Sequence, residues 1–302
     1  MRSLPITFHR MPWQGWLSST PAVADFRGIG RHDIAVNSWD DSSIVVIDGS
    51  TGEVIWRHAT GAPNMGGVAA YDLDGDGLPD VMSLSFDGYL YALRGRDGRV
   101  LWKAPLDKGG WSIPVVTDLN ADGVPYVIVI TAVGQLHVLD GQTGKEHWSP
   151  QVTGEMKVAG KPAVARERGH TIILAPLGKA GAVAFDWKTR REMWRSPEGF
   201  PVMASPVVTD LVGNGKQQAV IGATTGDVFI LGLSDGKPFW HSKICAQVSQ
   251  GEVAIEADPV ATDLDGDGIV DVLIASHDFH LYAISGRAVI EAIPNSNPTC
   301  LH

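Results

Sequence analysis

A tryptophan recurs every 46 residues through most of the chain, and this period constrains the fold more than any other feature of the sequence. The recurring residues are Trp56, Trp102, Trp148, Trp194 and Trp240. Four of them follow a glycine turn, with Gly52, Gly98, Gly144 and Gly236, whereas Lys188-Thr189-Arg190 precedes Trp194. A fixed period of this length is typical of solenoids and propellers, in which each repeat is one supersecondary unit.

Each repeat contains the pattern of four short strands. In the second repeat the predicted strands are 67–71, 81–84, 89–93 and 99–102, with Asp-Gly and Gly turns between them. Such short apolar runs at hairpin spacing indicate antiparallel strands, and no segment shows a sustained helical period. Four strands in 46 residues form the unit of a propeller blade. The sequence therefore predicts an all-β fold, a β-propeller.

The length of the chain sets the number of blades. Six repeats of 46 fit within 302 residues and seven do not, so we expect about six four-stranded blades, with seven as the alternative. The predicted blades lie near 18–60, 66–105, 111–150, 157–197, 202–244 and 254–294.

The two ends of the chain have different expected roles. The sixth repeat lacks the final tryptophan, and residues 1–17 carry the apolar Phe8, Trp13 and Trp16. We therefore predict that residues 1–17 add a strand beside the last blade, which would pair an exposed sheet edge. Residues 295–302 are expected to form a C-terminal tail.

The pattern DxDGDGxxD occurs twice, at the same phase of the repeat. In the second repeat the expected ligands are Asp72, Asp74, Asp76, the Leu78 carbonyl and Asp80; in the sixth they are Asp263, Asp265, Asp267, the Ile269 carbonyl and Asp271. Alternating carboxylates with a backbone carbonyl supply the oxygen shell that Ca²⁺ prefers, and the glycines permit a tight turn. The flanking strands predict a β-hairpin calcium loop, so we expect two Ca²⁺ sites.

The same loop is degraded in other repeats. The third repeat keeps Asp118, Asn120, Asp122 and the Val124 carbonyl, but Tyr126 replaces the last carboxylate, so a third site is an open possibility. The first repeat has Arg27 between Asp25 and Asp33, where a guanidinium could replace the ion. The fifth repeat lacks most carboxylates and the fourth has Arg166-Glu167-Arg168 in place of the loop, so neither should bind.

These motifs resemble two known families of repeat. DxDGDGxxD followed by Asp87-Gly88-Tyr89-Leu90-Tyr91-Ala92-Leu93 is similar to the FG-GAP or VCBS repeat, and Asp140-Gly141-Gln142-Thr143-Gly144-Lys145 up to Trp148 resembles the tryptophan motif of quinoprotein-type propellers. The resemblance covers about residues 18–294 and implies calcium binding and the propeller fold. Its members include adhesion-receptor heads, outer-membrane assembly factors, carbohydrate-active modules and quinone dehydrogenases, so it does not define the activity.

A non-catalytic binding role is the leading functional prediction. The chain lacks GxSxG, HExxH and phosphate-loop motifs, and it has only Cys245 and Cys300, whereas the quinone dehydrogenases it resembles use adjacent cysteines; we therefore expect no pyrroloquinoline quinone. The alternatives are a carbohydrate-active propeller, of lectin or polysaccharide lyase type, and less readily a quinone-dependent dehydrogenase. Whether Cys245 and Cys300 pair is left open by the sequence.

Charge and hydropathy bound the partners and the location. The formal charge of −10 argues against nucleic acid, and no apolar run is long enough for a membrane-spanning helix. No signal peptide is visible, yet calcium use and the family resemblance favour an extracytoplasmic protein. We expect a protein partner or a glycan at the turns opposite the calcium loops, with Trp39, Phe86, Lys108 and Trp111 as contacts.

Overall fold

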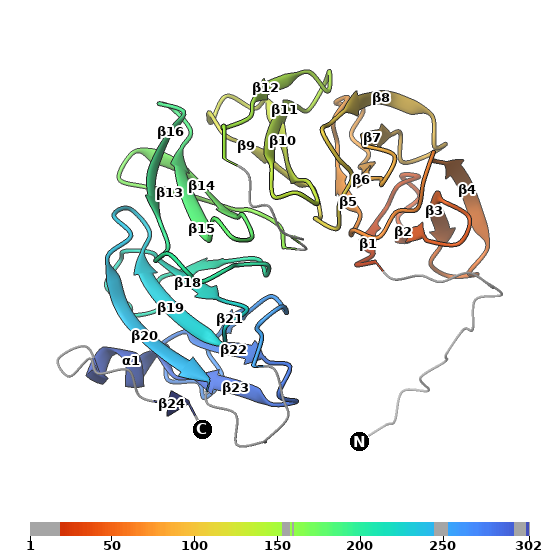
Figure 1. Ribbon diagram of the computed structural model, residues 1–302. Helices are drawn as coiled ribbons and strands as arrows, with labels where there is room; N and C mark the ends of the chain where they lie inside the picture. Colours follow the sequence, from red (N-terminus) through yellow and green to blue (C-terminus); the bar gives the residue numbers. More distant parts are fainter. Residues whose placement is uncertain (1–18, 153–157, 159, 245–252, 293–299, 302) are drawn as a thin grey trace, which may run out of the picture.

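The chain folds into six sheets that follow one another in sequence order around a common centre (Figure 1). The computed structural model describes residues 19–152, 158, 160–244, 253–292 and 300–301. The all-β propeller architecture predicted from the tryptophan period is confirmed, and we number the sheets as blades one to six. The predicted closing strand in residues 1–17 lies outside the described residues.

The first four blades each contain four antiparallel strands. Blade one comprises β1 (Ala22–Ala24), β2 (Asp33–Ser38), β3 (Ser43–Asp48) and β4 (Val54–Ala59). Blade two comprises β5 (Ala69–Tyr71), β6 (Asp80–Leu84), β7 (Tyr89–Leu93) and β8 (Val100–Pro105). Blade three comprises β9 (Val115–Asp118), β10 (Pro125–Ile130), β11 (Leu136–Asp140) and β12 (Glu146–Trp148). Blade four comprises β13 (Ala163–Glu167), β14 (His170–Pro176), β15 (Ala182–Asp186) and β16 (Arg191–Arg195).

The last two blades depart from this plan. Blade five comprises β17 (Val207–Thr209), β18 (Gln218–Gly222), β19 (Asp227–Gly232) and β20 (Pro238–Ile244), and β24 (Cys300–Leu301) pairs with β20 in parallel, with Lys243 opposite Cys300. The tail thus contributes a strand that the sequence did not predict. The question whether Cys245 and Cys300 pair, which the sequence left open, falls outside the described residues, since these do not include Cys245.

Blade six shows three strands in the described residues, followed by a helix where a fourth strand was predicted. The strands are β21 (Val260–Thr262), β22 (Asp271–Ala275) and β23 (Leu281–Ile284), and α1 spans Gly286–Ala292. This segment lacks the second turn glycine and the tryptophan of the other repeats, and its alanine, arginine and glutamate residues favour helix. Val289 on α1 is buried against the apolar core that Ile284 shares. In the described part of the chain, no helix has the length and apolarity of a membrane span.

The recurring tryptophans hold neighbouring blades together. Trp56 donates its indole N–H to the carbonyl of Gly95 at 2.6 Å, and Trp102 donates to the carbonyl of Gly141 at 2.8 Å. Each ring covers the turn glycine of the next blade, where an added Cβ would lie 2.7 Å from Trp56 at Gly98 and 2.5 Å from Trp102 at Gly144. The tryptophan and the glycine therefore recur together, because the tryptophan ring occupies the space that a side chain at the glycine position would need.

The core lies between adjacent sheets, so the central strands are buried on both faces. All residues of β6 and β10 are buried, and Leu84 of β6 packs with Val127 of β10 in one apolar cluster across the boundary between blades two and three. Two-sided burial explains why these strands are near-continuous apolar runs in the sequence rather than alternating ones. This rigid stack leaves the connecting turns at the two ends of the strands as the surfaces available for binding.

Candidate cation loops and the surface opposite them

The two DxDGDGxxD segments form closely similar loops between the first and second strands of blades two and six. Asp72 accepts hydrogen bonds from the amides of Gly75 and Gly77 at 2.8 and 2.9 Å. Asp263 accepts the equivalent bonds from Gly266 and Gly268 at 2.7 and 2.9 Å. Gly77, the second glycine of the blade-two loop, has φ of 84°, a left-handed conformation that favours glycine. The repeated motif thus encodes one local structure.

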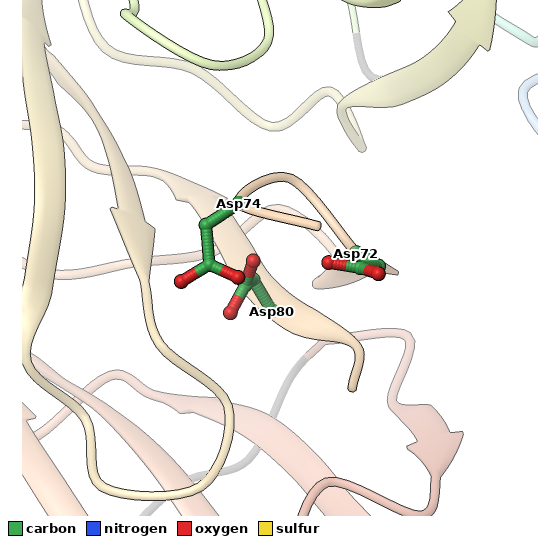
Figure 2. Close-up of side chains that lie close together, drawn as sticks. All are labelled: Asp72, Asp74 and Asp80. Carbon is green, nitrogen blue, oxygen red and sulfur yellow. The ribbon is translucent and has the colours of Figure 1, made fainter. Parts of the chain in front are cut away.

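Three carboxylates converge in each loop. Asp72, Asp74 and Asp80 each place a carboxylate oxygen within 4.8 Å of the others, and Figure 2 shows Asp74 facing Asp80. In blade six the converging residues are Asp263, Asp265 and Asp267, within the same limit. These are the only two such acidic groups in the residues that the structure describes. A triad of carboxylates at this spacing can serve a hard cation.

Predicted ligands inside and outside the triads also brace the loop backbone. Asp76 accepts the amide of Leu78 at 2.9 Å, and Asp267 accepts the amide of Ile269 at 2.8 Å, which fixes the residues predicted to offer carbonyls. Asp271 lies outside the second triad and accepts the amides of Leu264 and Gly286. The structure therefore groups three of the four predicted carboxylates in each loop and places the fourth in a supporting position.

Negative charge that is only partly compensated marks the acidic loop of blade two. Asp80 is buried, and this burial, aided by the nearby charge of Asp74, raises the pKa of its carboxyl to about 6. Arg94 reaches Asp74 at 3.4 Å, and in blade six Arg287 reaches Asp267 at 2.7 Å and lowers the pKa of that carboxyl through its hydrogen bond. Each loop thus has one arginine beside its triad, which offsets only part of the charge that a divalent cation would neutralise.

The loop of blade three has a backbone similar to that of the other two loops, but the side chain of its predicted ligand Asn120 is hydrogen-bonded to other side chains. Asp118 accepts the amides of Asn120 and Gly123 at 3.0 and 2.7 Å. Asn120 accepts the indole N–H of Trp187 at 2.6 Å and donates to the hydroxyl of Tyr126 at 3.0 Å. Sequence reasoning missed Trp187, which comes from blade four and stands where blades two and three have Gly95 and Gly141.

In the loop of blade one an arginine takes the place of an ion, as predicted, but between different carboxylates. Arg27 contacts Asp33 at 2.9 and 2.7 Å and Asp48 at 2.6 Å. Asp25, predicted as the second partner, instead accepts the amides of Ile29 and Gly30. The prediction failed there because Asp48 is the last residue of β3 and is distant from the loop in the sequence. Loop positions alone could not indicate it.

Two of the predicted partner contacts line a cavity of about 320 Å³ at the other ends of the strands. Its wall consists of Phe86, Asp87, Gly88, Tyr89, Pro105, Leu106, Asp107, Lys108 and Gly109. Trp111 packs edge-on against Phe86, with ring centroids 4.8 Å apart, so it supports the cavity from behind. Trp39 is half-buried and lies outside the lining. Asp87, Tyr89 and Asp107 are additions that the sequence analysis did not single out.

The lining carboxylates are partly engaged in local structure. Asp87 accepts the hydroxyl of Tyr91 at 2.6 Å and the amide of Gly61 at 2.8 Å. Asp107 contacts His137 at 2.7 Å, and the other ring nitrogen of that histidine lies 2.6 Å from Glu146. These bonds fix the cavity wall to blades two and three, so the cavity is a preformed surface.

Comparison with known proteins places the chain in a family. The family model described as outer membrane protein assembly factor BamB matches residues 10–124 and 87–297. The chain belongs to this family. Its PQQ-like repeats confirm the quinoprotein-type part of the resemblance, while the FG-GAP and calcium part stays a prediction. No curated protein sequence matches the chain.

Solved structures share the architecture at low sequence identity. BamB from Moraxella catarrhalis is 15% identical with a TM-score of 0.58, over 89% of this chain and 83% of that one. The computationally designed Ika8 protein is 13% identical with a TM-score of 0.60, over 89% and 70%. Quinohemoprotein alcohol dehydrogenase from Comamonas testosteroni is 17% identical with a TM-score of 0.54, over 76% of this chain but 43% of its own. Identities this low establish the fold alone.

Proposed function

We propose that the protein is a non-catalytic scaffold subunit of an extracytoplasmic assembly, stabilised by calcium at two loops. The observation that carries the scaffold role is the family match over residues 10–297, because the family is described as an outer membrane protein assembly factor. A factor of this kind acts by holding other proteins, and a propeller offers rigid turns for that purpose. Outer membrane assembly implies a periplasmic location, which agrees with the extracytoplasmic prediction.

The calcium part rests on the two equivalent loops. Each gathers three carboxylates within 4.8 Å at the same point of the repeat, with glycine turns that hold them together. Extracellular calcium modules bind with Kd of roughly 10⁻⁴–10⁻³ M, which suits sites filled outside the cytosol and left empty inside it. The ions would join β5 to β6 and β21 to β22, far from the proposed partner surface, so calcium has a structural role.

The partner surface that we propose is the cavity beside Phe86 and Lys108, together with Trp111 and the equivalent turn at Trp39. This surface is built from the turn between β6 and β7 and from the connection between blades two and three. Both lie at the ends of the strands opposite the calcium loops. An exposed lysine beside a half-buried aromatic ring is the kind of anchor found in protein interfaces. The cavity is small and rigid, which favours insertion of a partner side chain.

Site-specific photo-crosslinking in the native host tests this assignment. A photoreactive residue at position 86 or 108 should give a discrete higher-mass adduct, identifiable by mass spectrometry as an outer membrane assembly component. The same residue at position 145, which is exposed on the calcium-loop side, is the matched control. Adducts from position 145 but not from 86 or 108 would reject this surface. Reproducible turnover of a polysaccharide or alcohol, abolished by one substitution, would reject the non-catalytic role.

A glycan is the second candidate partner, favoured by the composition of the same cavity. Tyr89 contributes a ring edge, and Asp87 and Asp107 contribute carboxylate oxygens that can accept sugar hydroxyls. However, the Lys103 ammonium lies 3.7 Å above the Tyr89 ring and competes for its face. A glycan array separates the two candidates, since a lectin should retain defined sugars and lose them in Asp107→Ala, whereas a protein scaffold should retain none.

A further inference from the structure

Blade four departs from the repeat at three neighbouring places. Its first hairpin is closed by the short turn at Arg168 and Gly169, with Glu167 paired to His170, where blades two and six have a nine-residue acidic loop. Trp187 stands at the position of Gly95 and Gly141. Arg190 stands at the position of Gly144 and Gly236, 46 residues from each. All three changes fall on the calcium-loop side of the propeller.

Arg190 keeps the backbone conformation of the glycine that it replaces. Its φ is 60°, against 69° at Gly144 and 64° at Gly236. This left-handed region is unfavourable for a residue with a Cβ atom but not for glycine. The arginine side chain, unlike that of asparagine or aspartate, does not stabilise it by a local hydrogen bond. Strained residues of this kind cluster at binding and active sites, so the conformation of Arg190 calls for a functional reason.

At Arg190 the ring of the preceding blade is Trp148, whose centroid lies 5.8 Å from the guanidinium carbon. At Gly98, Gly144 and Gly236 the ring of the preceding blade would lie 2.5–2.7 Å from an added Cβ. In blade four the corresponding ring, Trp148, packs instead against Phe185 and Trp187, with centroids 5.3 and 6.3 Å apart. The substitution of glycine by Trp187 therefore goes together with the arginine that follows it.

The Arg190 guanidinium has an unused donor. Its central carbon lies 2.9 Å from the centroid of the Trp187 ring, and its Nη1 atom is buried without a hydrogen-bond partner among the described residues. Asp186, four residues earlier in the same hairpin, is engaged by His170 at 2.5 Å and by the amide of Thr189 at 2.6 Å. A buried guanidinium donor without an acceptor is costly, and a bound anion would satisfy it.

A cavity of about 420 Å³ opens at this guanidinium. It is lined by Leu119, Asn120, Gly169, Thr171, Trp187, Lys188 and Arg190. Lys188 is exposed and forms no ion pair within the described part of the chain. The short first hairpin of blade four, which lacks an acidic loop, contributes Gly169 and Thr171 to this lining. The wall of an overall acidic protein is thus locally basic.

We propose that this cavity binds a carboxylate of an acidic protein segment. Nη1 of Arg190 is the donor once a small rotation of the guanidinium brings it to the cavity, the exposed Lys188 ammonium supplies a second positive charge, and the Trp187 ring is part of the lining. One free guanidinium donor and one ammonium match a single-charged, planar carboxylate, whereas a phosphate dianion is usually held by more donors. This site lies on the side opposite the Phe86 cavity and requires no bound calcium, so it is independent of the proposed function.

Fluorescence anisotropy with a labelled octaglutamate peptide tests the site, in buffer without added calcium so that the metal cannot bridge the peptide. The wild-type protein should bind the peptide saturably and should not bind octaglutamine. Arg190→Gly, which restores the residue of the other repeats, should weaken binding at least tenfold, and Arg190→Lys should give an intermediate loss. Arg168→Gly is the matched control, because Arg168 is an exposed arginine in the same blade with φ of 51° and lies outside the cavity.

Two further measurements establish where the peptide binds and which anion the cavity prefers. The indole resonance of Trp187, assigned with Trp187→Phe, should shift during the peptide titration in wild type but not in Arg190→Gly. Acetate should displace the peptide at lower concentration than inorganic phosphate does. Equal peptide affinity in wild type and Arg190→Gly, equal loss in Arg168→Gly, no binding by wild type, or tighter competition by phosphate would each overturn the carboxylate proposal.

Discussion

Trp187 donates its indole N–H to the Oδ1 atom of Asn120 over 2.6 Å, across the boundary between blades four and three. Asn120 Oδ1 is the atom that the sequence offered as a cation ligand in the third loop. Its amide nitrogen is also engaged, by the hydroxyl of Tyr126. The third loop is therefore held by protein groups, whereas the loops of blades two and six have converging carboxylates with one arginine beside each triad.

From this contrast we predict two calcium ions per chain rather than three. Isothermal titration of metal-free protein should give a stoichiometry near two, because Asn120 would have to lose two hydrogen bonds to admit a third ion. Asp118→Ala should leave that number unchanged. A stoichiometry of three that falls to two in Asp118→Ala would show that the third loop opens to calcium.

Chelation should lower the melting temperature. At 2 mM calcium and the Kd range of extracellular modules, binding stabilises the folded state by about 1–2 kcal/mol per site, which corresponds to a total shift of roughly 5 °C. Asp74→Ala with Asp265→Ala should abolish the response to calcium in differential scanning calorimetry. Asp122→Ala, the same change in the third loop, is the matched control and should retain it. Equal melting of the calcium-loaded and chelated wild type would contradict the assignment.

The sequence predicted the architecture because the tryptophan and the turn glycine are a matched pair that recurs with the same period. It also predicted both acidic loops, since their ligands lie within nine consecutive residues. It could not find Asp48 as the partner of Arg27, or Trp187 as the partner of Asn120, because these contacts join segments far apart in the chain. Helix α1 was missed because seven residues are too few to display a helical period.

The matched pair of tryptophan and glycine gives a direct test. Gly98 and Gly123 have similar left-handed backbones, with φ of 70° and 83°, but only Gly98 lies under a ring. Gly123→Ala should cost about 1 kcal/mol from backbone strain. Gly98→Ala should cost about 1–3 kcal/mol more, because the new methyl group meets Trp56. Urea unfolding measures both, and equal losses would show that the ring moves aside freely.

The edge of blade six suggests a role for the N-terminal segment. Leu281 of β23 is 67% exposed, and Val260 and Val23 on the inner strands of the last and first blades are 53% and 60% exposed. We predict that residues 1–17 cover this edge, with Phe8, Trp13 and Trp16 as apolar contacts. Replacement of these three residues by serine should lower the unfolding free energy by about 3 kcal/mol, assuming partial burial of each ring. Unchanged stability would exclude a closing strand.

Arg190→Gly should separate binding from stability. If the arginine is retained for an anion, its left-handed backbone and its buried Nη1 are costs that the folded protein bears without ligand. Glycine removes both, so urea unfolding should show a gain of about 1 kcal/mol despite the lost contact with Trp187. Arg168→Gly removes the strain alone and should gain no more than that. A loss of stability in Arg190→Gly would mean that the guanidinium serves as packing for Trp187, and the strain would then have a structural cause.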